Sequence, residues 1–354
     1  MKTYIIRRLL LIIPTIFGIL LANFVVIQFA PGGPIENIVA KYTFGSNAQL
    51  NVDEYDNKQT DSYSGMESLR PAIIHELEAQ FGFDKPAHVR FFKMTWDYLR
   101  FDFGRSYYRN AGVLSIIIEK LPVSLSLAFW STLLMYLLAI PLGIRKAVMD
   151  GTPFDTWSSI TMNVFCAIPS FIFAVLLIVL FAGGSYFNLF PIRGLVSTNW
   201  HDLNLWGKII DYLWHITLPV ICMALSGFAV LTMLTKNSFV DELHKLYVTT
   251  ARSKGLADGA ILLRHVFRNA MLIVISNFPL TFLSMLFTGS MLIEIIFSLD
   301  GIGLLGLQSI LTRDYPVVFA TLYIYTLIGL IFKLISDIFL TAIDPRINFN
   351  AVHS

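Results

Sequence analysis

The sequence predicts an all-α polytopic membrane protein with six transmembrane helices and a large loop after the first of them. Hydrophobic residues make up 55% of its 354 positions and charged residues only 14%, whereas roughly a quarter of an average soluble domain is charged. Six apolar segments recur along the chain, and a helix of about 20 apolar residues is enough to cross the ~30 Å hydrocarbon core of a bilayer. The net charge of +2 carries little information, because the distribution of charge sets the orientation of a membrane protein.

The first span is expected at Leu9–Phe29, within an N-terminal transmembrane segment that covers residues 1–30. Its apolar run is longer than the roughly 7–15 residues of a cleavable signal core. No cleavage site follows, because Gln28-Phe29-Ala30 lacks the small-x-small pattern. Arg7 and Arg8 precede the run, so we expect an uncleaved span whose N-terminus lies in the cytoplasm.

Residues 31–121 are soluble in character and form the predicted large outer loop. Pro31-Gly32-Gly33-Pro34 ends the first helix, and the polar insert at residues 47–66 is typical of flexible chain. Helical patterns return at Pro71–Phe81 and His88–Phe101, with six expected packing residues: Leu77, Phe81, Phe91, Phe92, Trp96 and Leu99. A helical cap over the membrane core is the favoured interpretation, and contact of these aromatic side chains with the lipid surface is the alternative.

Five further spans are predicted within a membrane core at residues 122–342, which a cytoplasmic tail at residues 343–354 follows. They are Pro122–Ile144, Trp157–Phe181, Ile216–Thr235, Met271–Ile293 and Val317–Ala342. Pro169 and Pro219 are expected to bend the third and fourth spans, because proline removes a backbone donor and crowds the preceding turn.

The basic residues of the short connections are distributed unevenly between the two sides of the membrane. With the long first loop left out, twelve lie on the side of the N-terminus: Lys2, Arg7, Arg8, Arg145, Lys146, Lys236, Lys245, Arg252, Lys254, Arg264, Arg268 and Arg346. Only Arg193, Lys208 and Arg313 lie on the opposite side. Because short cytoplasmic loops collect Lys and Arg, both termini are predicted to be cytoplasmic.

The segment Glu294–Pro316 between the last two spans is apolar but interrupted by Gly301, Gly303 and Gly306. Non-helical backbone at membrane depth is tolerated only where protein or a water-filled cavity covers it. We therefore expect a broken segment that the rest of the protein covers.

The last span carries two charged residues one turn apart, Lys333 and Asp337. This spacing lets them pair on one helix face, and a charge within a span costs about 2.5–3.5 kcal/mol on insertion scales. Both lie toward the cytoplasmic end, where lysine can extend its ammonium group to the interface. A structural pair or subunit contact is therefore favoured over a proton or substrate relay.

Several classes of site do not fit the sequence. Cys166 and Cys222 lie within apolar runs, which favours core packing over a disulfide or a metal site. His75-Glu76 is not followed by a second histidine at the zinc-protease spacing, because Ala79 stands there. The chain carries no Gly-x-x-x-x-Gly-Lys-Ser/Thr phosphate loop, so we do not expect it to bind ATP in the usual way. No catalytic, cofactor or metal residues are predicted.

The stretch Phe239–Leu272 is polar, although long apolar segments flank it within a few residues on both sides. Six apolar positions at helical spacing predict a first helix: Phe239, Val240, Leu243, Leu246, Tyr247 and Ala251. Gly255 is expected to close this helix in the left-handed conformation, and Asp258 to be the N-cap of a second helix. The predicted result is a helical hairpin within a cytoplasmic loop at residues 236–270, which a soluble partner can grip.

The hairpin contains Tyr-Val-Thr-Thr-Ala-Arg-Ser-Lys-Gly-Leu at residues 247–256, followed by His265, Arg268 and Asn269. These residues resemble the coupling loop of the dipeptide/oligopeptide branch of ABC importer permeases. The general importer pattern begins with Glu-Ala-Ala, in place of which this chain has Thr249, Thr250 and Ala251. That departure matches the peptide branch, and Arg313–Val318 and Asp344–Ile347 are similar to the same branch.

The resemblance implies a type I ABC importer permease fold with a large periplasmic loop after the first helix. It also implies that the ATPase-coupling residues are Tyr247, Thr250, Ala251, Arg252, Lys254, Gly255, Leu256, Asp258, His265, Arg268 and Asn269. Binding of RNA or anionic lipid by the hairpin is disfavoured, because the six Lys and Arg residues of the loop at residues 236–270 are partly offset by Asp241, Glu242 and Asp258. A passive solvated loop is the other alternative.

The implied function is transport of oligopeptides across the bacterial inner membrane. The implied partners are a second homologous permease, separate or fused ATPase subunits that bind ATP and Mg, and a periplasmic peptide-binding protein. The insert at residues 47–66 hints at a specialised member of the microcin C type, which admits peptide-nucleotide antibiotics. Uncharged polar residues within the spans are expected to bond helix to helix, and some to line the translocation path: Asn163, Ser170, Ser226, Asn277 and Ser284.

A secondary transporter or channel is the alternative from a different class. It would need interrupted or charged midplane helices in both halves of the chain, and no such pair occurs. A membrane-embedded hydrolase is the third possibility, but no nucleophile-base spacing supports it.

Overall fold

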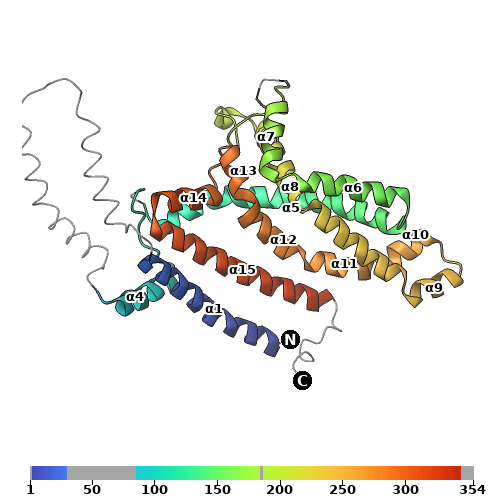
Figure 1. Ribbon diagram of the computed structural model, residues 1–354, viewed down its shortest axis with the longest axis horizontal. Coiled ribbons are helices and arrows are strands. Elements are labelled where there is room, and N and C mark those ends of the chain that lie inside the picture. Colours follow the sequence, from blue (N-terminus) through green and yellow to red (C-terminus); the bar gives the residue numbers. More distant parts are fainter. Residues whose placement is uncertain (1, 30–84, 110, 184–185, 344–354) are drawn as a thin grey trace, which may run out of the picture. The chain divides into compact units, whose positions relative to one another are not determined.

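The computed structural model describes residues 2–29, 85–109, 111–183 and 186–343, and these ranges consist of helices joined by short connections (Figure 1). The predicted insert at residues 47–66 and the predicted helix Pro71–Phe81 lie outside them. Among the described residues, five helices are long and apolar enough to cross a membrane, and a bent pair brings the number to six when it counts as one span. The predicted all-α class with six spans is confirmed.

The chain forms two compact units, the larger of which comprises residues 1–9, 118–307 and 325–354. Six of its helices are α5 (Val113–Val148), α6 (Pro153–Ala167), α7 (Ser170–Phe181), α8 (Leu205–Leu243), α11 (Phe267–Ser276) and α13 (Ser290–Ile296). α8 is the centre of this unit, because it packs against α6, α7, α11 and α13. Its Met223 and Phe239 are fully buried, in one hydrophobic core with Leu127 and Met135 of α5.

Two predicted spans differ from the observed helices. α5 begins at Val113, nine residues before the predicted start at Pro122. The predicted third span is divided into α6 and α7, which meet at an angle of 89° (Figure 1). The break lies at Pro169, whose ring forces Ile168 into an extended conformation with ψ 119°. Pro219, by contrast, lies inside α8 without interrupting it.

A network of charged residues joins the ends of α5, α6 and α8. The ammonium group of Lys146 is fully buried and lies 2.9 Å from the Asp155 carboxylate. Lys236 of α8 lies 2.6 Å from the same carboxylate and 2.8 Å from Asp150. The hydroxyls of Ser158 and Ser159 accept further hydrogen bonds from Lys146. Two of the basic residues counted for the orientation are therefore held in ion pairs, Lys146 fully buried and Lys236 half-buried.

The segment after α13 is broken and covered, as predicted. It continues into the short apolar helix α14 (Ile302–Thr312), whose break from α13 lies near Gly301, whereas Gly303 and Gly306 lie within the helix. The carboxylate of Glu294 is fully buried and accepts a hydrogen bond of 2.6 Å from the Ser124 hydroxyl and one of 2.8 Å from the amide of Leu304. A side chain at Gly301 would lie only 2.4 Å from this carboxylate, so the close approach requires glycine.

The second unit comprises residues 10–117 and 308–324, and it contains α4 (Ala87–Leu99) and most of α1 (Lys2–Phe29). A loop after α4 is bound to the start of α15 (Tyr315–Ile343): the Ser106 hydroxyl donates a hydrogen bond to the buried carboxylate of Asp314. Tyr98 and Phe103 pack edge to face, and both rings contact that of Tyr323.

Three of the packing residues predicted around α4 are exposed. Phe91 is buried as predicted, but Phe92, Trp96 and Leu99 are 65%, 56% and 54% exposed. The prediction treated all apolar residues of the helix as one face, whereas they occupy two. Leu77 and Phe81 lie outside the described residues.

Candidate functional site: a charged hairpin and a polar cavity

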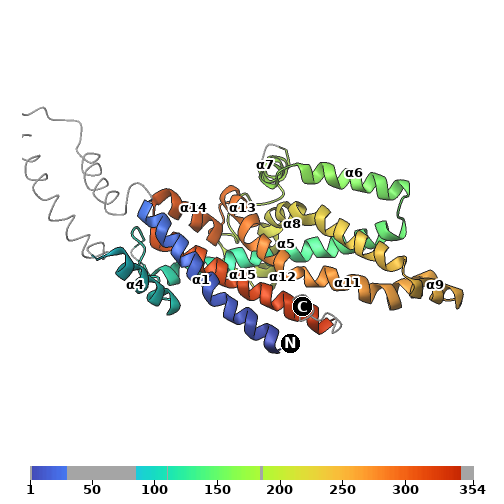
Figure 2. The ribbon, with the colours of Figure 1, turned by 60° about the horizontal axis from the view of Figure 1, so that its bottom comes forward.

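The predicted hairpin is present, with different helix boundaries. The predicted first helix is divided at His244–Lys245 into the end of α8 and the short helix α9 (Leu246–Ser253). After a turn, α10 (Asp258–Ile261) leads through a π-helical turn, Leu262–Val266, into α11. α9 and α10 project beyond the ends of α5 and α6 in both ribbon views (Figures 1 and 2).

Gly255 closes α9 in the left-handed conformation, with a φ of +80°. Its amide donates to the carbonyl of Arg252, and the amide of Leu256 donates to the carbonyl of Ala251. These two bonds form a Schellman motif, which satisfies carbonyls that the helix end would otherwise leave open. No atom lies within 4 Å of a Cβ added at Gly255, so only its backbone conformation restricts the residue. The predicted conformation is confirmed.

Asp258 is not the N-cap that the sequence predicts. Ala257 holds that position, and Asp258 is the first residue of α10. Its carboxylate lies 2.9 Å from Nε of Arg252, so the ion pair closes the hairpin across the turn. Both side chains are largely exposed, and such surface pairs contribute only about 0–1 kcal/mol. The negative charge of Asp258 is still favourable at the amino end of α10, where the helix dipole is positive.

The hairpin has one buried face and one exposed face. Its buried face consists of Val248, Ala251, Ile261, Val266 and Ala270. Most of the predicted coupling residues are exposed: Thr250, Arg252, Lys254, Gly255, Asp258, His265, Arg268 and Asn269, with Leu256 half-buried. Ala251 instead packs inside the hairpin, so its contribution to any contact is indirect. Two exposed leucines accompany the polar residues: Leu246 and Leu263 are 85% and 70% exposed.

Glu242 is a site residue that the sequence analysis did not identify. Its carboxylate is buried and accepts hydrogen bonds from Lys245 and from the Tyr247 hydroxyl, the latter over 2.8 Å. Burial and this hydrogen bond raise the pKa of Tyr247, which keeps the hydroxyl protonated as a donor. The signal in the sequence was the position of Glu242, three residues after Phe239 on the apolar side of the helix.

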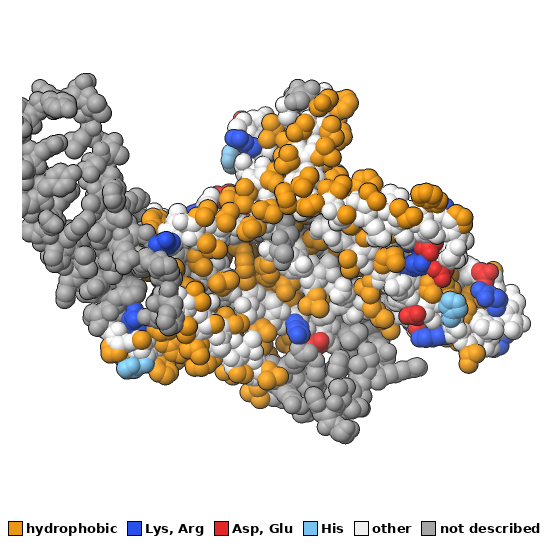
Figure 3. Space-filling view, in the orientation of Figure 1, with side chains coloured by type: hydrophobic (Ala, Val, Ile, Leu, Met, Phe, Trp, Pro, Cys, Tyr) orange, Lys and Arg blue, Asp and Glu red, His pale blue; other side chains and the backbone are white. Residues whose placement is uncertain are grey.

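Charged side chains gather where the hairpin projects, whereas hydrophobic side chains cover much of the neighbouring surface (Figure 3). A cavity of about 530 Å³ separates the hairpin from the end of α5. Its lining includes Asp150, His244, Arg252 and Asp258. The exposed face is therefore a charged surface with two apolar side chains, suited to contact with a soluble protein.

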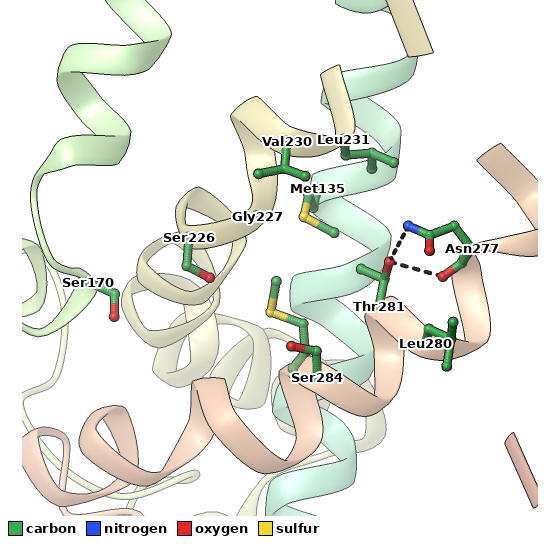
Figure 4. A pocket seen from close by; sticks show the side chains of 11 residues that line it. Met135, Ser170, Ser226, Gly227, Val230, Leu231, Asn277, Leu280, Thr281 and Ser284 are labelled. Atoms are coloured by element: carbon green, nitrogen blue, oxygen red, sulfur yellow. Dashed lines mark hydrogen bonds between the residues drawn. The ribbon is translucent and has the colours of Figure 1, made fainter. Parts of the chain in front are cut away.

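A second cavity, of about 450 Å³, lies between the membrane helices (Figure 4). Four of the five predicted polar positions line it: Ser170 of α7, Ser226 of α8, and Asn277 and Ser284 around α12 (Phe278–Ser284). Thr281, which was not predicted, also lines it. Asn163 does not belong to this lining.

Two of these polar residues form hydrogen bonds with groups three or four positions away along the chain. The Ser226 hydroxyl donates to the carbonyl of Met223, and Asn277 donates to the Thr281 hydroxyl over 3.2 Å. The polar atoms of these residues line the cavity, and the expected bonds between helices stay a prediction. Its remaining lining is apolar, with Met135, Gly227, Val230, Leu231, Leu280 and Met285.

The other predicted site residues are less informative. Lys333 is exposed and Asp337 half-buried one turn further along α15, and their ion pair stays a prediction. Cys166 and Cys222 are both free thiols. In the described part of the chain, no group of three His, Cys, Asp or Glu residues could hold a metal ion.

Residues 139–349 match the family described as the binding-protein-dependent transport system inner membrane component. The chain is 56% identical to the inner membrane ABC transporter permease protein YejB of Escherichia coli O157:H7 and 55% identical to the peptidoglycan transport system permease protein YejB of Agrobacterium fabrum (strain C58). It is 31% identical to the oligopeptide transport system permease protein AppB of Bacillus subtilis (strain 168). Each alignment covers 99% of this chain and 99% or more of the relative.

Among solved structures, the chain resembles an inward-facing form of the MetNI methionine ABC transporter. The TM-score is 0.50 and the sequence identity 14%, over 65% of this chain and 97% of the other. At that identity the likeness concerns the fold alone.

Proposed function

This chain belongs to the family of binding-protein-dependent transport system inner membrane components, and from that membership we propose that it forms one half of the membrane channel of an ATP-driven peptide importer. The relatives are permease components of ABC transporters, including oligopeptide systems. The observation that supports the mechanism is the projecting hairpin, with its exposed basic residues and its turn fixed by Gly255.

In the proposed mechanism, ATP is bound and hydrolysed by separate subunits, because this chain carries no phosphate loop. Those subunits hold the exposed face of the hairpin. The π-helical turn and α11 connect the hairpin to the core helix α8, against which α11 packs. Movement of the ATPases therefore reaches the membrane helices through a continuous helical path, and the permease couples two distant sites.

The proposed assembly also contains a second permease subunit and a binding protein that delivers the peptide. Both termini and the hairpin would lie in the cytoplasm, as the distribution of basic residues predicts. A secondary transporter has no ATPase partner and so gives the hairpin no role. The importer therefore accounts for more of the structure than that alternative does.

Peptides are the proposed substrate class, and the lining of the membrane cavity supports this choice. The polar side chains among its described lining residues are hydroxyls and one amide, and none of these lining residues is charged. Such groups can hydrogen-bond the backbone of many peptides without selecting the charge of their side chains. The Agrobacterium relative is named for peptidoglycan transport, and we include peptides derived from peptidoglycan in the proposed class.

The test is uptake by a strain in which the gene is deleted, compared with the same strain after complementation. We expect complementation to restore uptake of defined peptides, with di- to octapeptides and a peptidoglycan-derived peptide supplied separately. Purification of the tagged chain from the complemented strain should recover an ATPase subunit. Ion-gradient-driven uptake by the purified chain alone in liposomes would contradict the proposal and favour the secondary transporter.

A further inference from the structure

Helix α4 carries apolar side chains on two faces, only one of which packs against protein. Phe91 and Tyr98 are buried within the second unit. Val89, Phe92, Trp96 and Leu99 follow one another at helical spacings of three, four and three residues, and all four are exposed. This exposed stripe, defined by those four residues, is too apolar for a helix that is surrounded by water.

The contacts of Phe91 fix the depth at which α4 crosses the first span. Its ring lies 5.4 Å from that of Phe17 and 5.3 Å from that of Phe24, both in α1. The apolar part of α1 extends over Leu9–Val26, and almost none of its surface is buried by protein. Phe17 lies at the middle of this part and Phe24 near its carboxyl end. The Phe91 ring therefore lies between the middle and the carboxyl end of this apolar part, within one leaflet of the bilayer.

Basic side chains border the stripe. The guanidinium of Arg100 stacks over the Trp96 ring at 4.5 Å, and Lys93 is exposed one position after Phe92. Tryptophan is enriched at the level of the lipid headgroups. Helices that lie in the plane of a membrane combine an apolar face with Lys and Arg on the polar one, which attracts anionic headgroups.

We propose that α4 is an interfacial helix, which buries the stripe in the leaflet at the carboxyl end of α1 and places Lys93 and Arg100 among the phosphates. The occupant of the exposed face is thus the lipid bilayer, and it is continuous with the lipid that surrounds α1. This helix fixes the loop after the first span to the membrane surface. The inference goes beyond the transport function and does not depend on it.

The test uses nitroxide labels on the full-length chain in nanodiscs that contain phosphatidylglycerol, together with any subunits that copurify. Labels replace Phe92 and Trp96 on the stripe, and Lys93 and Asp97 serve as matched controls one residue further on. Cys166 and Cys222 are replaced by alanine. We expect collisions with oxygen, which dissolves in lipid, to exceed those with a water-soluble nickel chelate several-fold at Phe92 and Trp96. The ratio should reverse at Lys93 and Asp97.

Two results would overturn the proposal. If the chelate reached all four positions equally, the stripe would face water. If Phe92 and Trp96 were shielded from both reagents, a protein subunit would cover the stripe instead of lipid. The K93E/R100E double variant tests the headgroup contact without a label on the polar face. The oxygen-to-chelate ratio at Trp96 should fall in anionic nanodiscs but not in pure phosphatidylcholine, and an equal ratio in both would contradict the contact.

Discussion

The hydroxyl of Tyr247 donates a hydrogen bond of 2.8 Å to the carboxylate of Glu242, across the break that separates α8 from α9. Because Glu242 is buried, its carboxylate has little access to water and depends on Tyr247 and Lys245 for compensation. Asn269 of α11 lies 3.5 Å from the same hydroxyl, so one tyrosine connects both arms of the hairpin to the core helix. The orientation of the exposed face follows from this contact.

The variant Tyr247→Phe should therefore loosen the hairpin without unfolding the membrane core. A hydrogen bond to a charged group contributes roughly 1.5–3 kcal/mol, so we expect peptide uptake to fall at least tenfold while membrane insertion is retained. Asp241→Asn, at the exposed neighbouring position, is the matched control and should transport normally. Unchanged uptake by Tyr247→Phe, measured at equal protein level, would exclude this contact from the coupling.

Substitution of Gly255 separates backbone conformation from side-chain contact. Because no atom lies near an added Cβ, Gly255→Val is strained only by the positive φ, at a cost of about 1–2 kcal/mol. We expect the variant to insert normally and to lose most peptide uptake, with weaker recovery of the ATPase. Gly255→Asn, which tolerates the left-handed conformation, should retain most of the activity. Loss of the Val variant from the membrane would make Gly255 a folding residue instead.

The charged network at the ends of α5, α6 and α8 predicts a difference in stability between two acidic residues. Asp155→Ala leaves the fully buried ammonium group of Lys146 without its carboxylate, which costs about 3–5 kcal/mol. Asp150 is about half exposed and pairs with Lys236 at the surface, so Asp150→Ala should cost about 0–1 kcal/mol. Thermal unfolding of the two variants in detergent checks this order, and equal midpoints would contradict it.

The orientation is testable with single cysteines in a background that lacks Cys166 and Cys222. Ser253 lies at the end of α9, and Ser62 lies in the outer loop beyond the described residues. An impermeant maleimide should label Ser62→Cys in cells with a permeable outer envelope, and Ser253→Cys only after lysis. The reverse pattern would show that the hairpin faces outward. The orientation predicted from the distribution of basic residues would then be wrong.

Local features were predictable from the sequence, and features that depend on packing between distant segments were not. The turn at Gly255 and the break at Pro169 follow from the backbone preferences of single residues, so both were found. Which face of a helix meets protein depends on its neighbours, so Phe92 was expected to pack although it is exposed. Glu242 was missed because its partners Tyr247 and Asn269 approach it only in the folded hairpin.

The polar residues of the membrane cavity show the same limit. Their occurrence within apolar spans was visible in the sequence, but convergence of Ser170, Ser226 and Ser284 requires the arrangement of three helices. A single sequence shows the periodicity of a helix, but it does not show which side of the helix faces which neighbour. The sequence therefore showed which residues of the spans are polar, but not which of them share one cavity.

The right-angled break between α6 and α7 has a consequence for biogenesis. The two arms have 15 and 12 residues, and at a rise of 1.5 Å per residue neither reaches across a ~30 Å hydrocarbon core. Both arms pack against α8, which is synthesised after them. The bent form of this span therefore has all of its packing partners only after α8 has been synthesised.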